Sequence, residues 1–200
     1  MSIYQKFGKR LIDLLIAVVG IVVFAIPMLV IAIAVKLDSP GSALFLQRRL
    51  GKHQKIFTIY KFRSMCMNAY EMGGVATSSA DARITRVGAF LRRTSLDELP
   101  QLFNILVGQM SIIGPRPILP EEYNDFPGKE QYAARFDVTP GLFCTVDVDY
   151  RAAAERKLQF EMDTDYAKNI TLRGDLKVFF GVIKTVVSGE NVYKEEEHDK

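Results

Sequence analysis

The sequence predicts an α/β protein that is mostly helical, with an apolar N-terminal helix, a small β-hairpin and amphipathic helices that lie at a membrane interface. Three observations support this prediction: an uncharged run from Leu14 to Val35, two strand-like segments around Gly51, and helical spacing of apolar residues in the second half. We expect a membrane-inserted segment over residues 1–40, one folded domain over 41–193 and a disordered charged tail over 194–200.

The apolar run is long enough to cross a membrane. As a helix, its 22 residues would extend about 33 Å, which matches a bilayer core. Pro27 removes a backbone donor in the middle of the run and should kink the helix. Either a bent spanning helix or a re-entrant helix broken at Pro27 fits this pattern. Basic residues flank both ends, which favours re-entry, and the run is too long for a cleaved signal peptide.

Asp13 lies at the start of the apolar run, where an unpaired carboxylate is costly. Arg10 precedes it by three residues and so shares its helix face. We therefore predict that Arg10 and Asp13 pair with each other and anchor the helix at the interface, without a catalytic role.

Charge is distributed unevenly along the chain. Residues 1–70 contain ten Lys and Arg but two Asp and Glu, a net charge of +8, so the remainder carries −5. A basic end joined to an apolar segment fits an anionic membrane surface or phosphate groups. We exclude nucleic acid because no recognised binding motif accompanies these charges. Cys66 and Cys144 stand far apart, which predicts neither a disulfide framework nor a zinc site.

The first chemical candidate is the adjacent carboxylate pair Asp97 and Glu98. Four arginines precede this pair within sixteen residues, and apolar residues at helical spacing follow it up to Gly108. Ser95 and Glu98 also have the form of a capping box, which would be a purely structural role. Pro100 argues against a helix that already runs from Leu96, so we expect the helix to begin near the two carboxylates.

A carboxylate at this place should stay ionised, because the arginines and the positive end of the helix dipole both favour its charge. It can attack phosphorus once cations neutralise the phosphate. Arg116, held between Pro115 and Pro117, is a second candidate for binding phosphate, although a Pro-Arg-Pro stretch alone is as typical of a turn.

Several motifs occur in an order that resembles the bacterial sugar transferases, in particular the small monotopic phosphoglycosyl transferases. The motifs are Lys9–Asp13, Phe45–Gly51, Tyr60–Met65, Thr94–Gln101 and Met110–Pro117. The resemblance implies a re-entrant membrane helix, a catalytic domain on the cytoplasmic face of the bacterial inner membrane, and dependence on Mg2+. It implies transfer of a sugar 1-phosphate from a UDP-sugar to polyprenyl (undecaprenyl) phosphate in a ping-pong reaction.

The resemblance also implies roles for individual residues. Asp97 would be the nucleophile, Glu98 would assist, and both would be candidate Mg2+ ligands. The other substrate-binding candidates share a positive charge. Four lie in or next to the matching motifs, namely Lys61, Arg63, Arg92 and Arg116, and Arg151 matches a further family arginine by its distance to Phe160 and Asp163.

The chain departs from the family pattern in two places. Ile26 precedes Pro27 where a serine is frequent, and residues 142–151 differ from the usual segment, which can alter sugar or nucleotide preference. A phosphate-ester hydrolase at the membrane and a non-enzymatic membrane anchor protein stay open as alternatives. The identity of the sugar and the formation of a homodimer also stay open.

Overall fold

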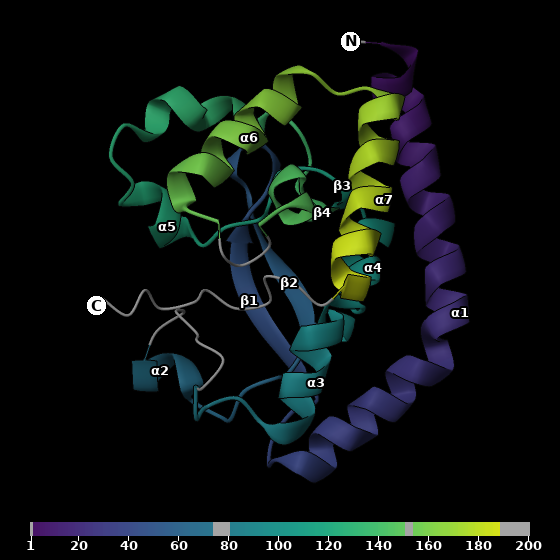
Figure 1. Cartoon of the computed structure of the whole chain (residues 1–200), viewed down its shortest axis with the longest axis vertical. Coiled ribbons are helices and arrows are strands. Elements are labelled where there is room, and N and C mark those ends of the chain that lie inside the picture. Colours follow the sequence, from purple (N-terminus) through teal and green to yellow (C-terminus); the bar gives the residue numbers. More distant parts are fainter. Residues whose placement is uncertain (1, 74–80, 151–153, 189–200) are drawn as a thin grey trace.

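The computed structural model describes residues 2–73, 81–150 and 154–188, and it confirms a mostly helical α/β fold (Figure 1). The N-terminal helix α1 (Lys9–Asp38) follows a π-helical turn (Tyr4–Gly8). The remaining helices are α2 (Ala69–Gly73), α3 (Arg86–Thr94), α4 (Gln101–Leu106), α5 (Pro120–Asn124), α6 (Arg156–Lys168) and α7 (Leu172–Ser188). Short 3-10 segments occupy Lys52–Gln54, Leu96–Glu98, Lys129–Phe136 and Thr145–Val148.

Helix α1 bends near its middle, as Figure 1 shows, and Pro27 lies inside it. The helix continues through the bend, because one missing hydrogen bond and one clash with the preceding turn bend a helix without ending it. The predicted kink is therefore present as a bend within one continuous helix. The segment Tyr4–Asp38 is long and apolar enough to cross a membrane, and almost none of its most apolar part is buried inside the protein.

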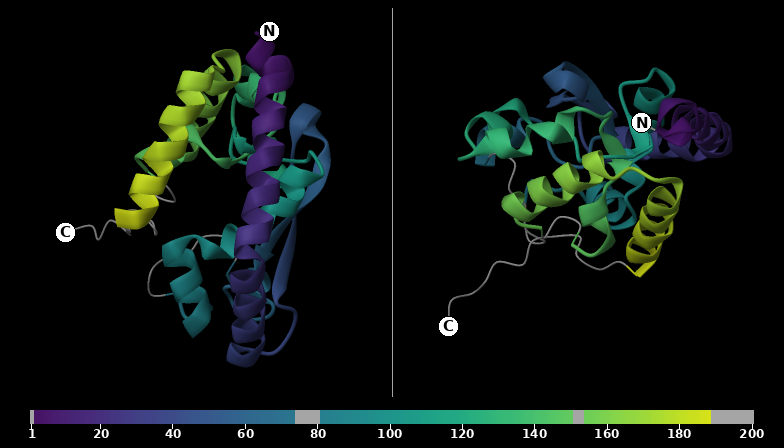
Figure 2. Two further views of the ribbon diagram at one scale, coloured as in Figure 1. Left: turned by 90° about the vertical axis from the view of Figure 1, so that its right-hand side faces the viewer. Right: turned by 90° about the horizontal axis from the view of Figure 1, so that it is seen from above.

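Both halves of α1 pack on the folded domain (Figure 2). In the first half, α1 approaches α4 so closely that a Cβ on Gly20 would lie 3.0 Å from Leu102 Cδ1. In the second half, Val35 is buried with Phe62 of β2 and Leu91 of α3. The helix is therefore fixed to one domain on both sides of its bend.

Arg10 and Asp13 attach α1 to this domain through separate partners. The Asp13 carboxylate is buried and accepts hydrogen bonds from Ser111 Oγ at 2.7 Å and from the Ile112 backbone N–H at 2.9 Å. Arg10 instead donates to the carbonyls of Ile105 and Leu106 at the end of α4. The predicted ion pair between Arg10 and Asp13 is wrong, because each side chain finds partners in the folded domain.

The predicted hairpin is present as β1 (Leu44–Leu50) and β2 (Ile56–Phe62), which pair antiparallel. Residues that face each other across the two strands share one side of the hairpin. One side therefore carries the pairs Phe45 with Lys61, Gln47 with Ile59, and Arg49 with Phe57.

A second sheet joins β3 (Ser111–Ile113) to β4 (Gly141–Phe143) in parallel. The segment that follows β3 lies very close to the start of β4, where a Cβ on Gly141 would lie 2.1 Å from the Gly114 backbone nitrogen. Only glycine fits at this contact, which places the segment after Gly114 directly beside β4.

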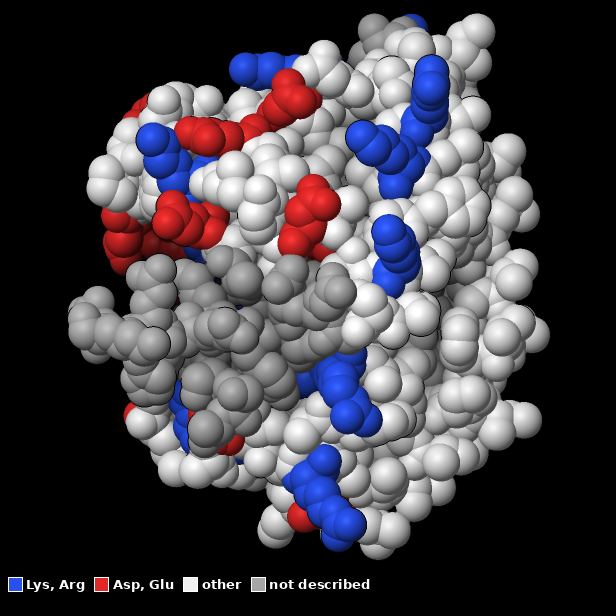
Figure 3. All heavy atoms as spheres, in the orientation of Figure 1, with Lys and Arg blue, Asp and Glu red and all other residues white. Residues whose placement is uncertain are grey.

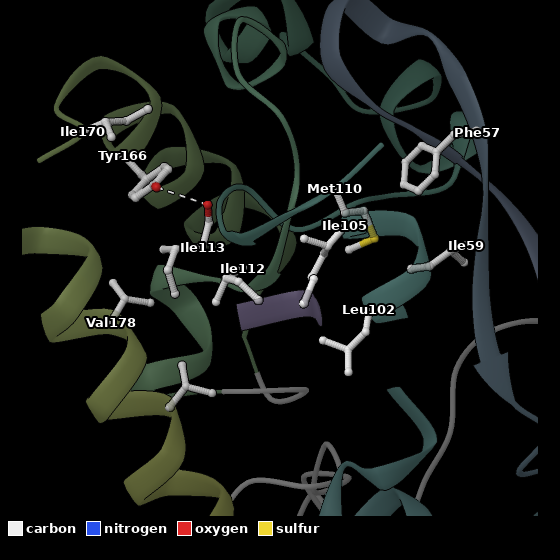
Figure 4. Packing of buried hydrophobic residues seen from close by; sticks show 12 residues of the cluster. Phe57, Ile59, Leu102, Ile105, Met110, Ile112, Ile113, Tyr166, Ile170 and Val178 are labelled. Carbon is white, nitrogen blue, oxygen red and sulfur yellow. Dashed lines mark hydrogen bonds between the residues drawn. The ribbon is translucent and has the colours of Figure 1, made fainter. Parts of the chain in front are cut away.

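The main core lies between α1, α4, α7 and the strands (Figure 4). The Tyr166 hydroxyl of α6 lies 2.8 Å from Asp175 Oδ1 of α7 and 3.2 Å from the Ile113 carbonyl oxygen, so β3, α6 and α7 meet at one buried polar point. Helix α7 directs Val178 and Val182 into this core. Phe179 and Val186 pack against the same core and are partly buried. Five other apolar side chains of α7 are exposed, namely Leu172, Leu176, Phe180, Ile183 and Val187.

Replacing Asp13 tests how strongly α1 is attached to the domain. We expect Asp13→Ala to lower the free energy of unfolding by about 2–3 kcal/mol, because it leaves the buried Ile112 N–H without its acceptor. Chemical unfolding in detergent measures the change, with Asp125→Ala at an exposed carboxylate as the control. Equal stability of the two variants would contradict the buried anchor.

Candidate active site

The two carboxylates of the predicted site lie on a single 3-10 turn between two helices. Helix α3 ends where Ser95 adopts a left-handed conformation, with φ of 57°, and the turn Leu96–Glu98 follows. Pro100 then caps α4. Ser95 makes no side-chain capping bond here, so the capping-box interpretation of Ser95 and Glu98 is wrong. The helix begins after the carboxylates because Pro100 favours the start of a helix over its interior.

Asp97 is buried, with 9% of its surface exposed. Burial raises the pKa of its carboxyl to about 6, and the neighbouring Glu98 carboxylate adds to this effect. The positive charges of Lys61 and Arg92 oppose the shift. The carboxyl is therefore mostly ionised at neutral pH, as the sequence predicts, but its pKa lies closer to neutrality than the prediction implied. Its charge depends on nearby cations, as expected for a buried reactive group.

Glu98 forms an ion pair with Lys61 of β2, whose Nζ lies 2.6 Å from Glu98 Oε1. Both residues line a small pocket that is open to solvent. The pocket also contains two arginines and a glutamine, and its full lining is Arg49, Ile59, Lys61, Glu98, Gln101, Arg116, Pro117, Gly141 and Leu142. Three cationic side chains thus surround one carboxylate, which makes the pocket suited to anions. Asp97 directly precedes Glu98 on the turn but is not itself part of the lining.

Arg116 is held in place from its backbone as well as its side chain. Asp163 accepts the Arg116 backbone N–H at 3.2 Å, and Arg135 donates to the Arg116 carbonyl at 2.8 Å. Arg135 and Asp163 also pair with each other at 2.5 Å and are almost fully buried. The Arg116 guanidinium lies 3.1 Å from Asp147, whose charge raises the pKa of the arginine. The flanking prolines predicted a fixed arginine, and this buried pair strengthens the effect.

The other predicted site residues are distributed differently. Arg92 donates its Nε to Ser64 Oγ at 2.9 Å and favours the charge of Asp97. Arg63 does not line the pocket, and its guanidinium donates to the carbonyls of Ser39 and Pro40 at the end of α1. The guanidinium is thus held at the end of α1 by carbonyls that the helix leaves without partners, and a role of Arg63 in substrate binding stays a prediction. Arg151 lies outside the described residues.

Arg49 and Gln101 line the pocket but were not predicted as site residues. Three residues that hold Arg116 were not predicted either, namely Asp147, Asp163 and Arg135. Arg49 and Gln101 lie within two of the quoted motifs, which was the available signal. The other three lie far from the carboxylates in the sequence, so only the folded chain reveals their role.

The carboxylates can be compared with the needs of Mg2+. In the part of the chain that the structure describes, no three His, Cys, Asp or Glu side chains form a cluster. Mg2+ in phosphoryl-transfer sites is commonly held by one or two carboxylates together with substrate phosphates and water. Asp97 and Glu98 fit this pattern, although Lys61 already pairs with Glu98.

A model of the family described as bacterial sugar transferase matches residues 4–189. The chain belongs to the bacterial sugar transferase family. The match confirms the resemblance inferred from the ordered motifs. The matched residues include α1, the carboxylate turn and the pocket.

This sugar transferase is similar to several named proteins, two of which carry undecaprenyl phosphate in their names. The chain is 41% identical over 92% of its length to a UDP-N-acetylgalactosamine-undecaprenyl-phosphate N-acetylgalactosaminephosphotransferase of Aeromonas hydrophila, and it spans 44% of that protein. It is 36% identical to a UDP-glucose:undecaprenyl-phosphate glucose-1-phosphate transferase of Caulobacter vibrioides, covering 92% of this chain and 72% of the relative. It is 37% identical to the exopolysaccharide production protein PSS of Rhizobium leguminosarum, covering 88% and 92%.

The raised pKa of Asp97 predicts how an uncharged replacement changes stability with pH. A carboxyl whose pKa rises on folding stabilises the folded state below its unfolded value near 4, and this contribution is lost as the pH rises through about 6. As the pH rises from 4 to 8, the free energy of unfolding of Asp97→Asn should therefore increase by about 2–3 kcal/mol relative to that of the unmodified protein. Unfolding of both proteins at each pH measures this difference, and a constant difference would contradict the shifted pKa.

Proposed function

We propose that this sugar transferase moves a sugar 1-phosphate from a UDP-sugar to undecaprenyl phosphate or a similar polyprenyl phosphate. The products are UMP and a polyprenyl-diphosphate-sugar, which begins the membrane stage of bacterial glycan assembly. The observation that carries this proposal is the carboxylate turn beside a pocket lined by three cations. The relatives from Aeromonas hydrophila and Caulobacter vibrioides, whose names include a UDP-sugar and undecaprenyl phosphate, support the same lipid acceptor and the same class of donor.

In the proposed first step, a carboxylate oxygen of Asp97 attacks the β-phosphorus of the UDP-sugar. The bond between this phosphorus and the bridging oxygen breaks, and UMP leaves with the electron pair. The sugar phosphate is then bound to Asp97 as an acyl phosphate. In the second step, a phosphate oxygen of the lipid attacks the same phosphorus and releases the Asp97 carboxylate, which completes a ping-pong cycle.

The surrounding residues fit these two steps. Lys61 and Arg116 supply positive charge where negative charge accumulates on the transferred group. The buried pair Arg135 and Asp163 fixes the backbone of Arg116. Arg116 therefore loses little conformational entropy when phosphate binds. A Mg2+ ion held by Asp97 or Glu98 would neutralise part of the diphosphate charge. Glu98 would also orient Lys61 through their ion pair.

The membrane arrangement in this proposal follows from the packing of α1. Both halves of α1 pack on the same domain. If α1 crossed the bilayer as a straight helix, one half would have to lose its contacts with that domain. We infer that α1 enters the bilayer and returns to the same side, with the domain on the cytoplasmic face of the inner membrane. Figure 3 shows an uncharged band over α1 beside Lys and Arg side chains over α7 and α3. These cations suit anionic lipid headgroups.

A direct assay tests the proposed reaction. Detergent-solubilised protein with Mg2+, a panel of UDP-sugars and undecaprenyl phosphate should release UMP with at least one sugar. Asp97→Asn should lower this rate by at least about a thousandfold, because an amide oxygen is a poor nucleophile. Asp125→Asn, at an exposed position, serves as the matched control. Free sugar phosphate formed without lipid would identify a hydrolase instead, and an equal rate in Asp97→Asn would contradict the assignment.

The pH dependence of the rate follows from the ionisation of Asp97. Below about pH 6 the carboxyl takes up its proton, so kcat/KM should fall about tenfold per pH unit. A profile measured from pH 4.5 to pH 8 under single-turnover conditions checks this expectation. A flat profile across pH 6 would contradict it.

Cysteine labelling tests the membrane geometry. Ser2→Cys and Ser42→Cys, each in a Cys66→Ser background, place a thiol at an exposed site before or after α1. In sealed inverted vesicles, a reagent that does not cross membranes should label both positions, because both lie on the cytoplasmic side. Labelling from opposite sides would show that α1 spans the bilayer.

A further inference from the structure

The pocket contains two buried nitrogen atoms without hydrogen-bond partners. Across residues 2–73, 81–150 and 154–188, unpaired buried side-chain atoms occur on six residues. Of these six, Arg49 and Gln101 line the pocket. The unpaired atoms are Arg49 Nε and Gln101 Nε2, and both are hydrogen-bond donors. A buried donor without an acceptor is unfavourable, so both atoms indicate that an acceptor enters this pocket.

Gln101 lies three residues after Glu98, at the first position of α4. Its side chain is almost completely buried, with 2% exposed, yet its amide nitrogen has no acceptor. Pro100 and the preceding 3-10 turn fix this position relative to the carboxylates. The amide is thus held beside the place where the proposed chemistry occurs.

Arg49 comes from the other wall of the pocket. Its Nη2 donates to Gln47 Oε1 at 2.6 Å, and its Nη1 lies 3.3 Å from the carbonyl of Pro117, directly after Arg116. These bonds orient the guanidinium and leave Nε unpaired. Burial lowers the pKa of Arg49 to about 10. The charge of Glu122, whose Oε2 lies 3.5 Å from Arg49 Nη1, opposes this shift, while the charges of Arg116 and Arg156 add to it. The side chain therefore stays charged at neutral pH, and its unpaired Nε can still donate to an anion in the pocket.

We propose that the Gln101 amide and the Arg49 guanidinium form a phosphate-binding subsite beside Arg116. Phosphate oxygens accept several hydrogen bonds from amide and guanidinium groups, which matches the two free donors. The phosphate belongs either to the diphosphate of the donor or to the headgroup of the lipid acceptor, and both present the same oxygens. This inference rests on the proposed function, in which the pocket receives each phosphate in turn.

The test separates the two half-reactions. UMP release by a single turnover without lipid reports on the donor, and discharge of the labelled protein by undecaprenyl phosphate reports on the acceptor. Gln101→Leu keeps the size of the side chain but removes its donor, and it should slow one or both half-reactions at least tenfold. Arg49→Met should slow the same step about a hundredfold, and Arg49→Lys about tenfold, because lysine keeps the charge without the planar donors. The affected step identifies the source of the phosphate.

A matched control excludes a merely structural role. Gln159 is also buried with an unpaired Nε2, but it lies on α6 and does not line the pocket. Gln159→Leu should leave both half-reactions within twofold of the unmodified protein. Removing the unpaired donor of Gln101 should leave the melting temperature unchanged or raise it. A lower melting temperature for Gln101→Leu with proportional loss of both steps would overturn the subsite, as would unchanged rates in Gln101→Leu and Arg49→Met.

A binding measurement keeps this inference separate from the proposed function. Calorimetric titration of the protein with inorganic pyrophosphate needs no turnover, and Gln101→Leu and Arg49→Met should each weaken binding at least tenfold. If the unmodified protein releases no UMP from any UDP-sugar, the proposed reaction fails, while the titration still decides the subsite. Equal pyrophosphate affinity in all of these proteins would overturn the subsite even if transfer occurs.

Discussion

The electrostatic balance around Asp97 is the constraint on which the rest of this site depends. A buried carboxylate favours its protonated form, and a protonated acid is a poor nucleophile. Lys61 and Arg92 oppose this tendency, while Glu98 adds to it. The result is a carboxylate that is mostly ionised at neutral pH but not strongly stabilised in that form. Such a group can give its electron pair to phosphorus more readily than one held in a strong ion pair.

The scaffold serves this balance by bringing charged residues from distant segments to one turn. Lys61 comes from the hairpin, Arg92 from α3 and Arg116 from the segment after β3. The close contact of Gly114 with Gly141 places that segment beside β4. The buried Asp13 links β3 to α1, so the membrane segment and the pocket share one rigid connection.

Much of this arrangement could be predicted because its signals are local in the sequence. The two strand-like segments around Gly51 predicted the hairpin, Pro27 predicted the bend, and the ordered motifs indicated the family and the carboxylate turn. The errors involve partners that the fold brings from far away. Arg10 and Asp13 looked like a local pair but bind α4 and β3, roughly a hundred residues later in the chain. The contact of Arg63 with the Ser39 carbonyl at the end of α1 is likewise one that its motif does not indicate. No spacing rule foretells that Arg135 and Asp163 hold the backbone of Arg116.

Mass spectrometry of the protein after a brief pulse of UDP-sugar shows whether Asp97 becomes covalently modified. With Mg2+ present and no lipid acceptor, we expect a phosphosugar adduct on the peptide that contains Asp97, which disappears when undecaprenyl phosphate is added. A protein that turns over without such an adduct, or an adduct on Glu98 or another residue, would contradict the assignment of Asp97 as the nucleophile.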